Sequence, residues 1–252
     1  MGTNTQSHQM QIVYDDPQTR TRPDKICYQS TELEHVGEIQ DLGVTLDTKL
    51  TFAPHVAIIV SRANRSLGLM IRSFQTGSRD SKFDRSALLS AYFSNVRSIL
   101  EYCSVIWAGA ANTHTVRVDR VQHKFLIWLL CHTSSGHAHS VSYQDLLCHF
   151  RIPSLASRRI QHDLLFIRNV LAKLDSQALL LCFSLHVPAR LTRTHRLFEV
   201  PRARVNTVQS GLFCRAPRLI NCFLSCDAVD ADIFADSFTT FRTHVKRYIA
   251  SL

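Results

Sequence analysis

The sequence lacks the short motifs that mark many self-contained active sites. It has no glycine-rich phosphate-binding loop, no Gly-x-Ser-x-Gly nucleophile motif and no His-Glu-x-x-His zinc motif. It also lacks an apolar N-terminal run, and its longest apolar stretch, residues 178–187, is about half the length of a membrane-spanning helix. We therefore expect no cofactor and no membrane role, and a location inside the cell, in the nucleus or cytoplasm, without secretion.

Cysteine is present, but not in a spacing typical of a disulfide framework or a zinc finger. The eight cysteines form no Cys-x-x-Cys pair, and most lie in apolar helical patterns where a free thiol packs as a small hydrophobic group. A chain of this length without a signal peptide is expected to stay reduced. One mixed group has the right ligand types for zinc but the wrong spacing, so we predict no metal site. Its members are Cys131, His132, His137, His139, Cys148 and His149.

Acidic residues are fewer than basic ones. The 252 residues include 29 Lys and Arg against 20 Asp and Glu, which gives a net charge of +9 at neutral pH. This balance favours a polyanionic partner such as nucleic acid. The alternative is an ordinary soluble surface that carries more basic than acidic side chains and has no polyanionic partner. An apolar content of 45% is enough for a core in one large domain or two small ones.

Hydrophobic spacing changes along the chain from strand-like to helical. Residues 10–14, 25–28, 33–36 and 39–46 have the composition of strands, and Gly43 in the last of them predicts a bulge or a close backbone approach. Apolar residues recur at spacings of three and four in most of the later chain. We predict a mainly α fold with a small N-terminal antiparallel β element and an irregular basic C-terminal segment. The predicted helices are residues 52–74, 84–107, 113–131, 143–150, 154–174 and 217–223, and a last one from Asp236.

Two of these helices, residues 52–74 and 113–131, each carry a stripe of three basic side chains. At 100° per residue the three side chains of the first helix fall within about 80° of one another, and those of the second are spaced at i, i+3 and i+7. Because few acidic residues stand near them, phosphate contact is favoured over an ordinary solvated helix face. The six residues are Arg62, Arg65, Arg72, Arg117, Arg120 and Lys124.

Two patterns that could suggest catalysis are rejected on the sequence. Tyr14-Asp15-Asp16 resembles the paired metal-binding carboxylates of polymerases. That chemistry needs a third carboxylate on an earlier strand, however, and none of the thirteen residues before Tyr14 is acidic. Cys103 lies near Glu101 in a predicted core helix with no histidine nearby in the sequence, which argues against a nucleophile. We predict no catalytic residue.

Five short blocks occur in an order that is specific when they are taken together. The first block, Asp41-Leu42-Gly43-Val44, stands about ten residues before a Phe-x-x-His helix start. The other four are residues 99–107, with a Leu-Glu-Tyr-x-x-x-x-Trp pattern, 118–126, 152–159 and 215–221. Over residues 40–252 they resemble the primer grip, thumb and post-thumb region of a non-LTR (LINE-type) retrotransposon reverse transcriptase, most like the jockey branch.

The resemblance implies three segments. Residues 1–50 would be a β-rich remnant of the palm edge and primer grip, residues 51–175 a helical thumb-like domain, and residues 176–252 a post-thumb segment ending in an amphipathic helix. In the family the primer grip, here Asp41, Leu42, Gly43 and Val44, positions the primer end, and the thumb helices hold the template–primer duplex. The block at residues 152–159 adds Arg158 and Arg159 to the predicted nucleic-acid-binding residues.

The resemblance also implies the partners, which are RNA, DNA or an RNA–DNA hybrid, together with the remainder of a polymerase chain. The parent family is an RNA-directed DNA polymerase. Its endonuclease, fingers and palm, with the catalytic carboxylates, have no counterpart in this sequence, so we expect a truncated fragment without enzyme activity. The alternative is a helical interaction module or a degenerate remnant with no nucleic-acid role, because a thumb without its palm should expose apolar surface.

Overall fold

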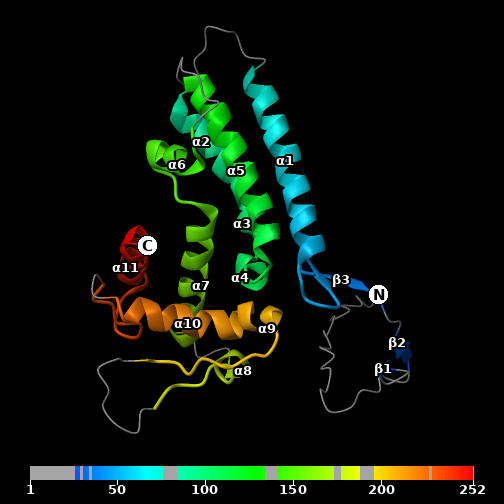
Figure 1. Cartoon of the computed structure of the whole chain (residues 1–252), viewed down its shortest axis with the longest axis vertical. Helices are drawn as coiled ribbons and strands as arrows, with labels where there is room; N and C mark the ends of the chain where they lie inside the picture. The colour runs from blue at the N-terminus through cyan, green and yellow to red at the C-terminus, as the bar shows by residue number, and fades with distance from the viewer. Residues whose placement is uncertain are drawn as a thin grey trace, which may run out of the picture. The chain divides into compact units, whose positions relative to one another are not determined.

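A computed structural model shows a mainly helical protein with small antiparallel β elements near the N-terminus, as predicted (Figure 1). The predicted strand at residues 10–14, the Tyr14-Asp15-Asp16 sequence and the loop histidines His137 and His139 lie outside the described part. The structure describes residues 26–28, 31–33, 36–75, 84–133, 141–172, 177–187, 196–226 and 229–251.

The chain divides into two units, residues 1–37 and residues 38–252. In the first unit, β1 (Ile26–Tyr28) pairs with β2 (Thr31–Leu33) in an antiparallel arrangement. The second of these strands begins two residues earlier than the sequence predicts and ends at Leu33. The predicted segment limits at residues 50 and 175 stay predictions.

The second unit begins with a hairpin. The residue pattern predicts one continuous strand over residues 39–46, whereas the resemblance to a primer grip implies a hairpin there. Its strands are β3 (Glu38–Asp41) and β4 (Val44–Asp47), which pair antiparallel. Leu42 and Gly43 form the turn between them with φ values of 43° and 81°. Positive φ at both central positions is the type I′ pattern, and glycine adopts it without steric cost. Gly43 therefore marks a chain reversal and not a bulge.

The first hydrophobic core lies among α1 (Ala53–Gln75), α5 (Asn112–Thr133) and the helical segment between them. The two long helices pack against each other and run in the same direction (Figure 1). Their buried side chains recur at spacings of three and four, which confirms the predicted periodicity. Tyr92 stacks on Phe125 of α5 with the ring centroids 4.0 Å apart, and both rings are fully buried.

The helix predicted over residues 84–107 is interrupted, so that prediction is wrong in part. Tyr102 leaves the helical conformation and Cys103 has φ 48°, which ends one helix and starts another. The carbonyl of Tyr102 instead accepts a hydrogen bond from Nε1 of Trp107 at 2.8 Å. The segment consists of α2 (Arg85–Tyr92), a π-helical turn (Phe93–Arg97), α3 (Ser98–Glu101) and α4 (Ser104–Trp107).

Two further helices follow α5. They are α6 (Tyr143–Phe150) and α7 (Leu155–Ala172). Ser154 caps α7, since its hydroxyl accepts a hydrogen bond from the backbone N–H of Ser157 at 3.0 Å. Helix α7 belongs to both hydrophobic cores, because its first residue packs in the first core and its later apolar residues pack in the second.

The second core lies among the later part of α7 and three further helices. The helix predicted over residues 217–223 starts earlier, so Pro217 lies inside it. Phe198, Phe223 and Phe241 are fully buried in this core. None of the helices in the described ranges is both long enough and apolar enough to span a bilayer. The three helices are α8 (Gln177–Leu180), α10 (Leu212–Leu224) and α11 (Phe238–Ser251). The short helix α9 (Asn206–Ser210) packs next to α10 and buries no side chain of its own.

Candidate nucleic-acid interface

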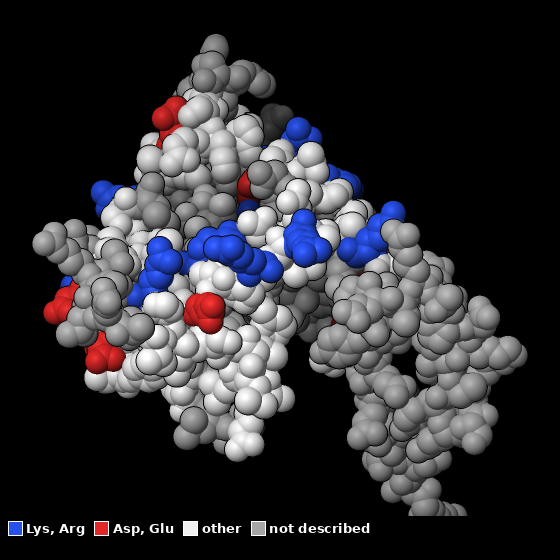
Figure 2. Space-filling model, turned by 60° about the horizontal axis from the view of Figure 1, so that its bottom comes forward, with Lys and Arg blue, Asp and Glu red and all other residues white. Residues whose placement is uncertain are grey.

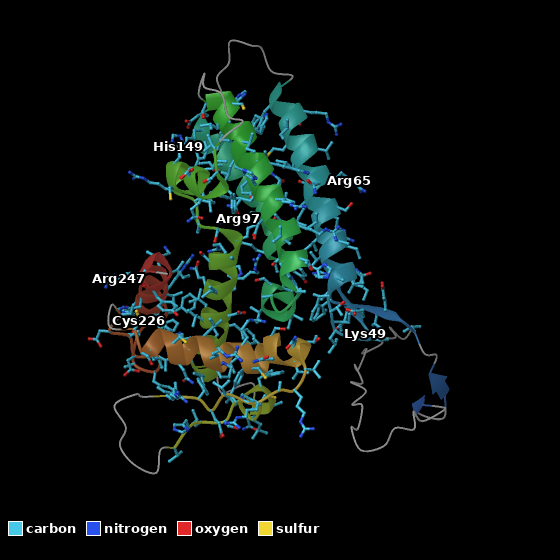
Figure 3. The ribbon with its side chains drawn as sticks, viewed as in Figure 1. Lys49, Arg65, Arg97, His149, Cys226 and Arg247 are labelled. Atoms are coloured by element: carbon cyan, nitrogen blue, oxygen red, sulfur yellow. The ribbon has the colours of Figure 1, made fainter. Side chains whose placement is uncertain are left out.

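Helix α1 exposes three arginines. Arg62, Arg65 and Arg72 are all exposed, whereas Ala63 and Leu67 on the opposite side of the helix are buried in the first core. Figure 3 shows Arg65 on the outer side of α1. The helix contains no acidic residue, so these guanidinium groups have no carboxylate on their own helix to neutralise them.

Helix α5 carries the second set of basic side chains. Arg117, Arg120 and Lys124 are exposed, and Val121 beside them faces the core. The acid of this helix, Asp119, is turned toward α7 and lies 3.8 Å from Arg159. The basic stripe of α5 is therefore not neutralised by its own helix either.

One hydrogen bond joins the basic stripe of α5 to α1, against which it packs. Lys124 Nζ donates a hydrogen bond to Oδ1 of Asn64 at 3.3 Å, and Asn64 is the neighbour of Arg65 in α1. At 100° per residue, Arg65 and Arg72 lie about 80–100° around α1 from Asn64, and Arg62 lies about 160° from it. Lys124 thus lies at the seam between the two helices, whereas the α1 arginines lie away from it, on the outer side of α1. Within the described ranges, Arg65, Arg72, Arg117 and Arg120 form no ion pair.

The predicted primer grip is the tip of the β3–β4 hairpin. The tip is held against the helical part of the unit, because the hydroxyl of Tyr102 donates to the carbonyl of Leu42 at 2.8 Å. Val44 is buried beneath the hairpin, while the side chain of Leu42 is 82% exposed. Asp41 ends β3, directly before the turn. The turn of the hairpin therefore exposes the Leu42 side chain, while Tyr102 and the buried Val44 hold its backbone against the helices.

The base of the hairpin is tied to the start of α1. The N–H of Thr45 donates to Nδ1 of His55 at 3.3 Å, and His55 is only 1% exposed. The carboxylate of Asp47 accepts hydrogen bonds from Thr51 and Phe52. Partial burial raises the pKa of Asp47, but these hydrogen bonds outweigh the burial and the pKa is lowered overall. His55 is the histidine of the Phe-x-x-His helix start, but the sequence does not predict these hydrogen bonds, because the partners of Asp47 and His55 become visible only in the folded turn.

Arg158 and Arg159 occupy a different environment from the other predicted cations. Arg158 binds Glu101 through two hydrogen bonds of 2.9 Å, and Arg159 is 9% exposed beside Asp119. A guanidinium group that already binds a carboxylate in a partly buried site stabilises the fold, and it would have to break that ion pair to bind a phosphate. We therefore leave both arginines out of the candidate interface. Their partners are far away in the sequence, which is why the sequence pattern could not reveal them.

Glu101 is the centre of a network between α3, α4 and α7. Arg97 also reaches it, with Nε 3.3 Å from Oε1, and His162 Nε2 lies 3.7 Å from Oε2. Burial raises the pKa of Glu101, but the hydrogen bonds and charge of Arg158, with the charge of Arg97, lower it overall. Nδ1 of His162 is 2.9 Å from the hydroxyl of Ser104.

This Ser–His–Glu alignment resembles a hydrolase triad in connectivity, but it cannot act as one as it stands. Ser104 is 2% exposed, so a substrate carbonyl cannot reach its hydroxyl. Arg158 also lies between the histidine and the carboxylate, with its NH2 group 3.1 Å from Nε2 of His162. The network joins helices and offers no chemistry to a substrate.

Acid is expected to destabilise the protein before most carboxylates titrate. Burial lowers the pKa of His55 and of His162, and the charges of Arg62 and Arg158 respectively lower it further. The unfolded chain therefore binds protons first as the pH falls below about 6.5, and stability decreases from there through the folded-state pKa values. Urea midpoints at about pH 7 and about pH 5.5 measure the decrease. The variant His55→Gln/His162→Gln should lose less between the two pH values, and an equal loss would contradict this account.

The described members of the Cys and His group considered for zinc do not form a metal site. Cys131, His132, Cys148 and His149 are all exposed, and His132 stacks on Trp128 with centroids 5.2 Å apart. Among the residues that the structure describes, no group of three or more His, Cys, Asp or Glu could hold a metal ion.

No family model, curated protein or solved structure matches this chain. The resemblance to reverse transcriptases therefore depends on the five sequence blocks and stays a prediction.

Proposed function

We propose that this chain binds template–primer nucleic acid through the basic surface of α1 and α5, as a non-catalytic part of a reverse-transcriptase-like protein. The observation that carries the proposal is a set of exposed cations on two packed helices, without carboxylate partners in the part of the chain that the structure describes. Arginine and lysine bind phosphate oxygens in any sequence context, so this surface suits a nucleic-acid backbone.

The β3–β4 hairpin fits the same proposal. By the family resemblance, Asp41 to Val44 would position the primer end. The hydrogen bond from Tyr102 to Leu42 holds that tip in place, and Thr45 and His55 tie its base to α1. A hairpin fixed to the first basic helix would keep a constant position relative to the bound duplex. No residue of this chain is proposed to perform catalysis.

Binding of a labelled RNA–DNA hybrid of about 20 base pairs tests the proposal, with fluorescence anisotropy at about 50 mM and about 200 mM salt. The variant Arg65→Gln/Arg117→Gln/Arg120→Gln removes three exposed charges. We expect it to weaken binding at least about tenfold and to reduce the log–log salt slope by about two to three, because fewer counterions are released.

The matched control removes three exposed charges from α11 in the variant Arg242→Gln/Lys246→Gln/Arg247→Gln. Arg247 lies at the opposite side of the view from Arg65 in Figure 3. If binding depended on net charge alone, the two variants would weaken it equally. Equal weakening, or no binding by the unaltered chain, would contradict the proposed interface.

One observation favours a second candidate function, that of a helical interaction module. Apolar side chains near the hairpin are unusually exposed: Leu42 by 82%, Ile39 by 56%, Leu50 by 52% and Tyr102 by 51%. Such groups mark surfaces that a partner covers. Sedimentation velocity distinguishes the two functions, because association through this surface would grow with protein concentration and persist in high salt.

A further inference from the structure

A second basic surface lies in the C-terminal part of the chain, on a segment that carries no helical pattern. The segment following residue 195 is anchored by Phe198, which is 1% exposed and lies 5.9 Å from Phe183 between ring centroids. Phe198 also forms a β-bridge with Leu185. This segment is therefore part of the second core and not a loose connection.

Asn221 of α10 holds the backbone of the same segment. Its Oδ1 accepts hydrogen bonds of 3.0 Å from the N–H groups of Leu197 and Phe198, and its Nδ2 donates to the carbonyl of Phe198 at 2.7 Å. Asn221 is 8% exposed, so these bonds are sheltered from water. The side chains on either side of Phe198 are thus presented from a fixed backbone.

Four arginines are exposed around this anchor. Arg196, Arg202 and Arg204 lie on the segment, and Arg218 lies on α10 one helical turn before Asn221. None of the four has a hydrogen-bond or ion-pair partner among the described residues. Residues 196–226 contain a single acid, Glu199. Figure 2 brings forward the bottom of Figure 1, where α8, α9 and α10 lie, and shows Lys and Arg side chains gathered in a row across that face.

The chemistry of this surface favours a single-stranded nucleic acid. All four cations are arginines, whose planar groups bind phosphate in a forked manner and stack on bases. Phe213, 41% exposed, contacts Phe183 with the ring centroids 5.6 Å apart, and so offers an aromatic face next to the anchored segment. A membrane surface is usually bound by an amphipathic helix with a basic face, whereas three of these arginines stand on irregular backbone.

We propose that Arg196, Arg202, Arg204 and Arg218, with Phe213, form a binding surface for single-stranded RNA or DNA, separate from the surface on α1 and α5. The arginines bind the phosphates and the phenylalanine stacks on a base. This surface does not require the α1 and α5 surface to bind a duplex. If both bind, a hybrid with a single-stranded overhang is held at two places and binds more tightly than a blunt one.

The test uses the full chain with labelled single strands of about 20 nucleotides, oligo(U) and oligo(dT), beside the blunt hybrid. The variant Arg196→Gln/Arg202→Gln/Arg204→Gln should bind the single strands at least about tenfold more weakly, with a salt slope smaller by about two. Its affinity for the blunt hybrid should stay within about twofold. The α11 variant Arg242→Gln/Lys246→Gln/Arg247→Gln is the charge-matched control and should bind single strands as the unaltered chain does.

Further variants separate stacking from charge. Phe213→Leu keeps an apolar side chain but removes the ring, and we expect it to weaken single-strand binding about fivefold or more without changing the salt slope. Single-strand binding that is absent, or equally weakened by the α11 control, would overturn the proposal. So would binding of the unaltered chain to anionic phosphatidylserine vesicles in preference to both oligonucleotides. The α1 and α5 proposal is judged separately, on the blunt hybrid.

Discussion

Replacing Arg215 with Met is expected to lower the free energy of unfolding by about 3–5 kcal/mol. Arg215 binds both carboxylate oxygens of Asp163, at 2.8 and 3.1 Å, and Asp163 is 1% exposed. Its guanidinium group also donates to the carbonyls of Ser210 and Val105, at 2.6 and 2.9 Å. Without Arg215 the carboxylate would remain buried without a cation, and two carbonyls would lose their donor.

The pKa of Asp163 shows how strongly the site disfavours an unpaired charge. Burial raises this pKa, and the hydrogen bonds and charge of Arg215 only partly offset the rise. In the Met variant we expect Asp163 to become protonated at a higher pH. The variant should therefore lose more stability at pH 8 than at about pH 5, because the neutral acid is easier to bury.

Urea unfolding followed by circular dichroism measures this effect. Arg218→Met, on the exposed side of the same helix, is the control and should change stability by no more than about 0.5 kcal/mol. The double variant Asp163→Leu/Arg215→Met should recover most of the loss, since an apolar pair of similar volume leaves no buried charge. A loss below about 1 kcal/mol in the single variant would show that water reaches Asp163 in the native state.

The long helices could be predicted from the sequence because each buries one face. In α1, α5 and α7 the period of 3.6 residues sets which side chains enter the core, and the apolar residues follow it. The break at Tyr102 and Cys103 could not be predicted, since neither glycine nor proline marks it. It depends on Trp107, whose indole N–H reaches the Tyr102 carbonyl only when the fold is complete.

The same distinction applies to the candidate sites. The exposure of Arg65 and Arg120 follows from the helical period, because a residue opposite a buried face must lie at the surface. The ion pair of Arg158 with Glu101 joins elements that only tertiary packing brings together. The sequence predicts an irregular basic C-terminal segment but not a binding surface on it. The segment has neither helical nor strand periodicity to show which side chains are exposed, and the anchor at Asn221 is a single side chain.

Replacing Trp107 with Ala is the second change with a large expected effect, again about 3–5 kcal/mol of unfolding free energy. Trp107 is fully buried in the first core, and its indole lies 6.1 Å from the ring of His55. The change removes the largest side chain of that core and the donor to the Tyr102 carbonyl. Trp128, the other tryptophan of the sequence, remains as a fluorescent reporter of unfolding.

The consequence of this change should extend to the hairpin. Tyr102 holds the tip of β3–β4 through its hydroxyl, and Trp107 fixes the backbone of Tyr102. Trp107→Phe keeps most of the buried ring but loses the indole N–H, so it should cost less stability, about 1–3 kcal/mol. Faster hydrogen exchange in β4 should accompany both variants. Exchange in β4 that is unchanged while stability falls would show that Trp107 supports the core without supporting the hairpin, and that the tip is held by its own turn.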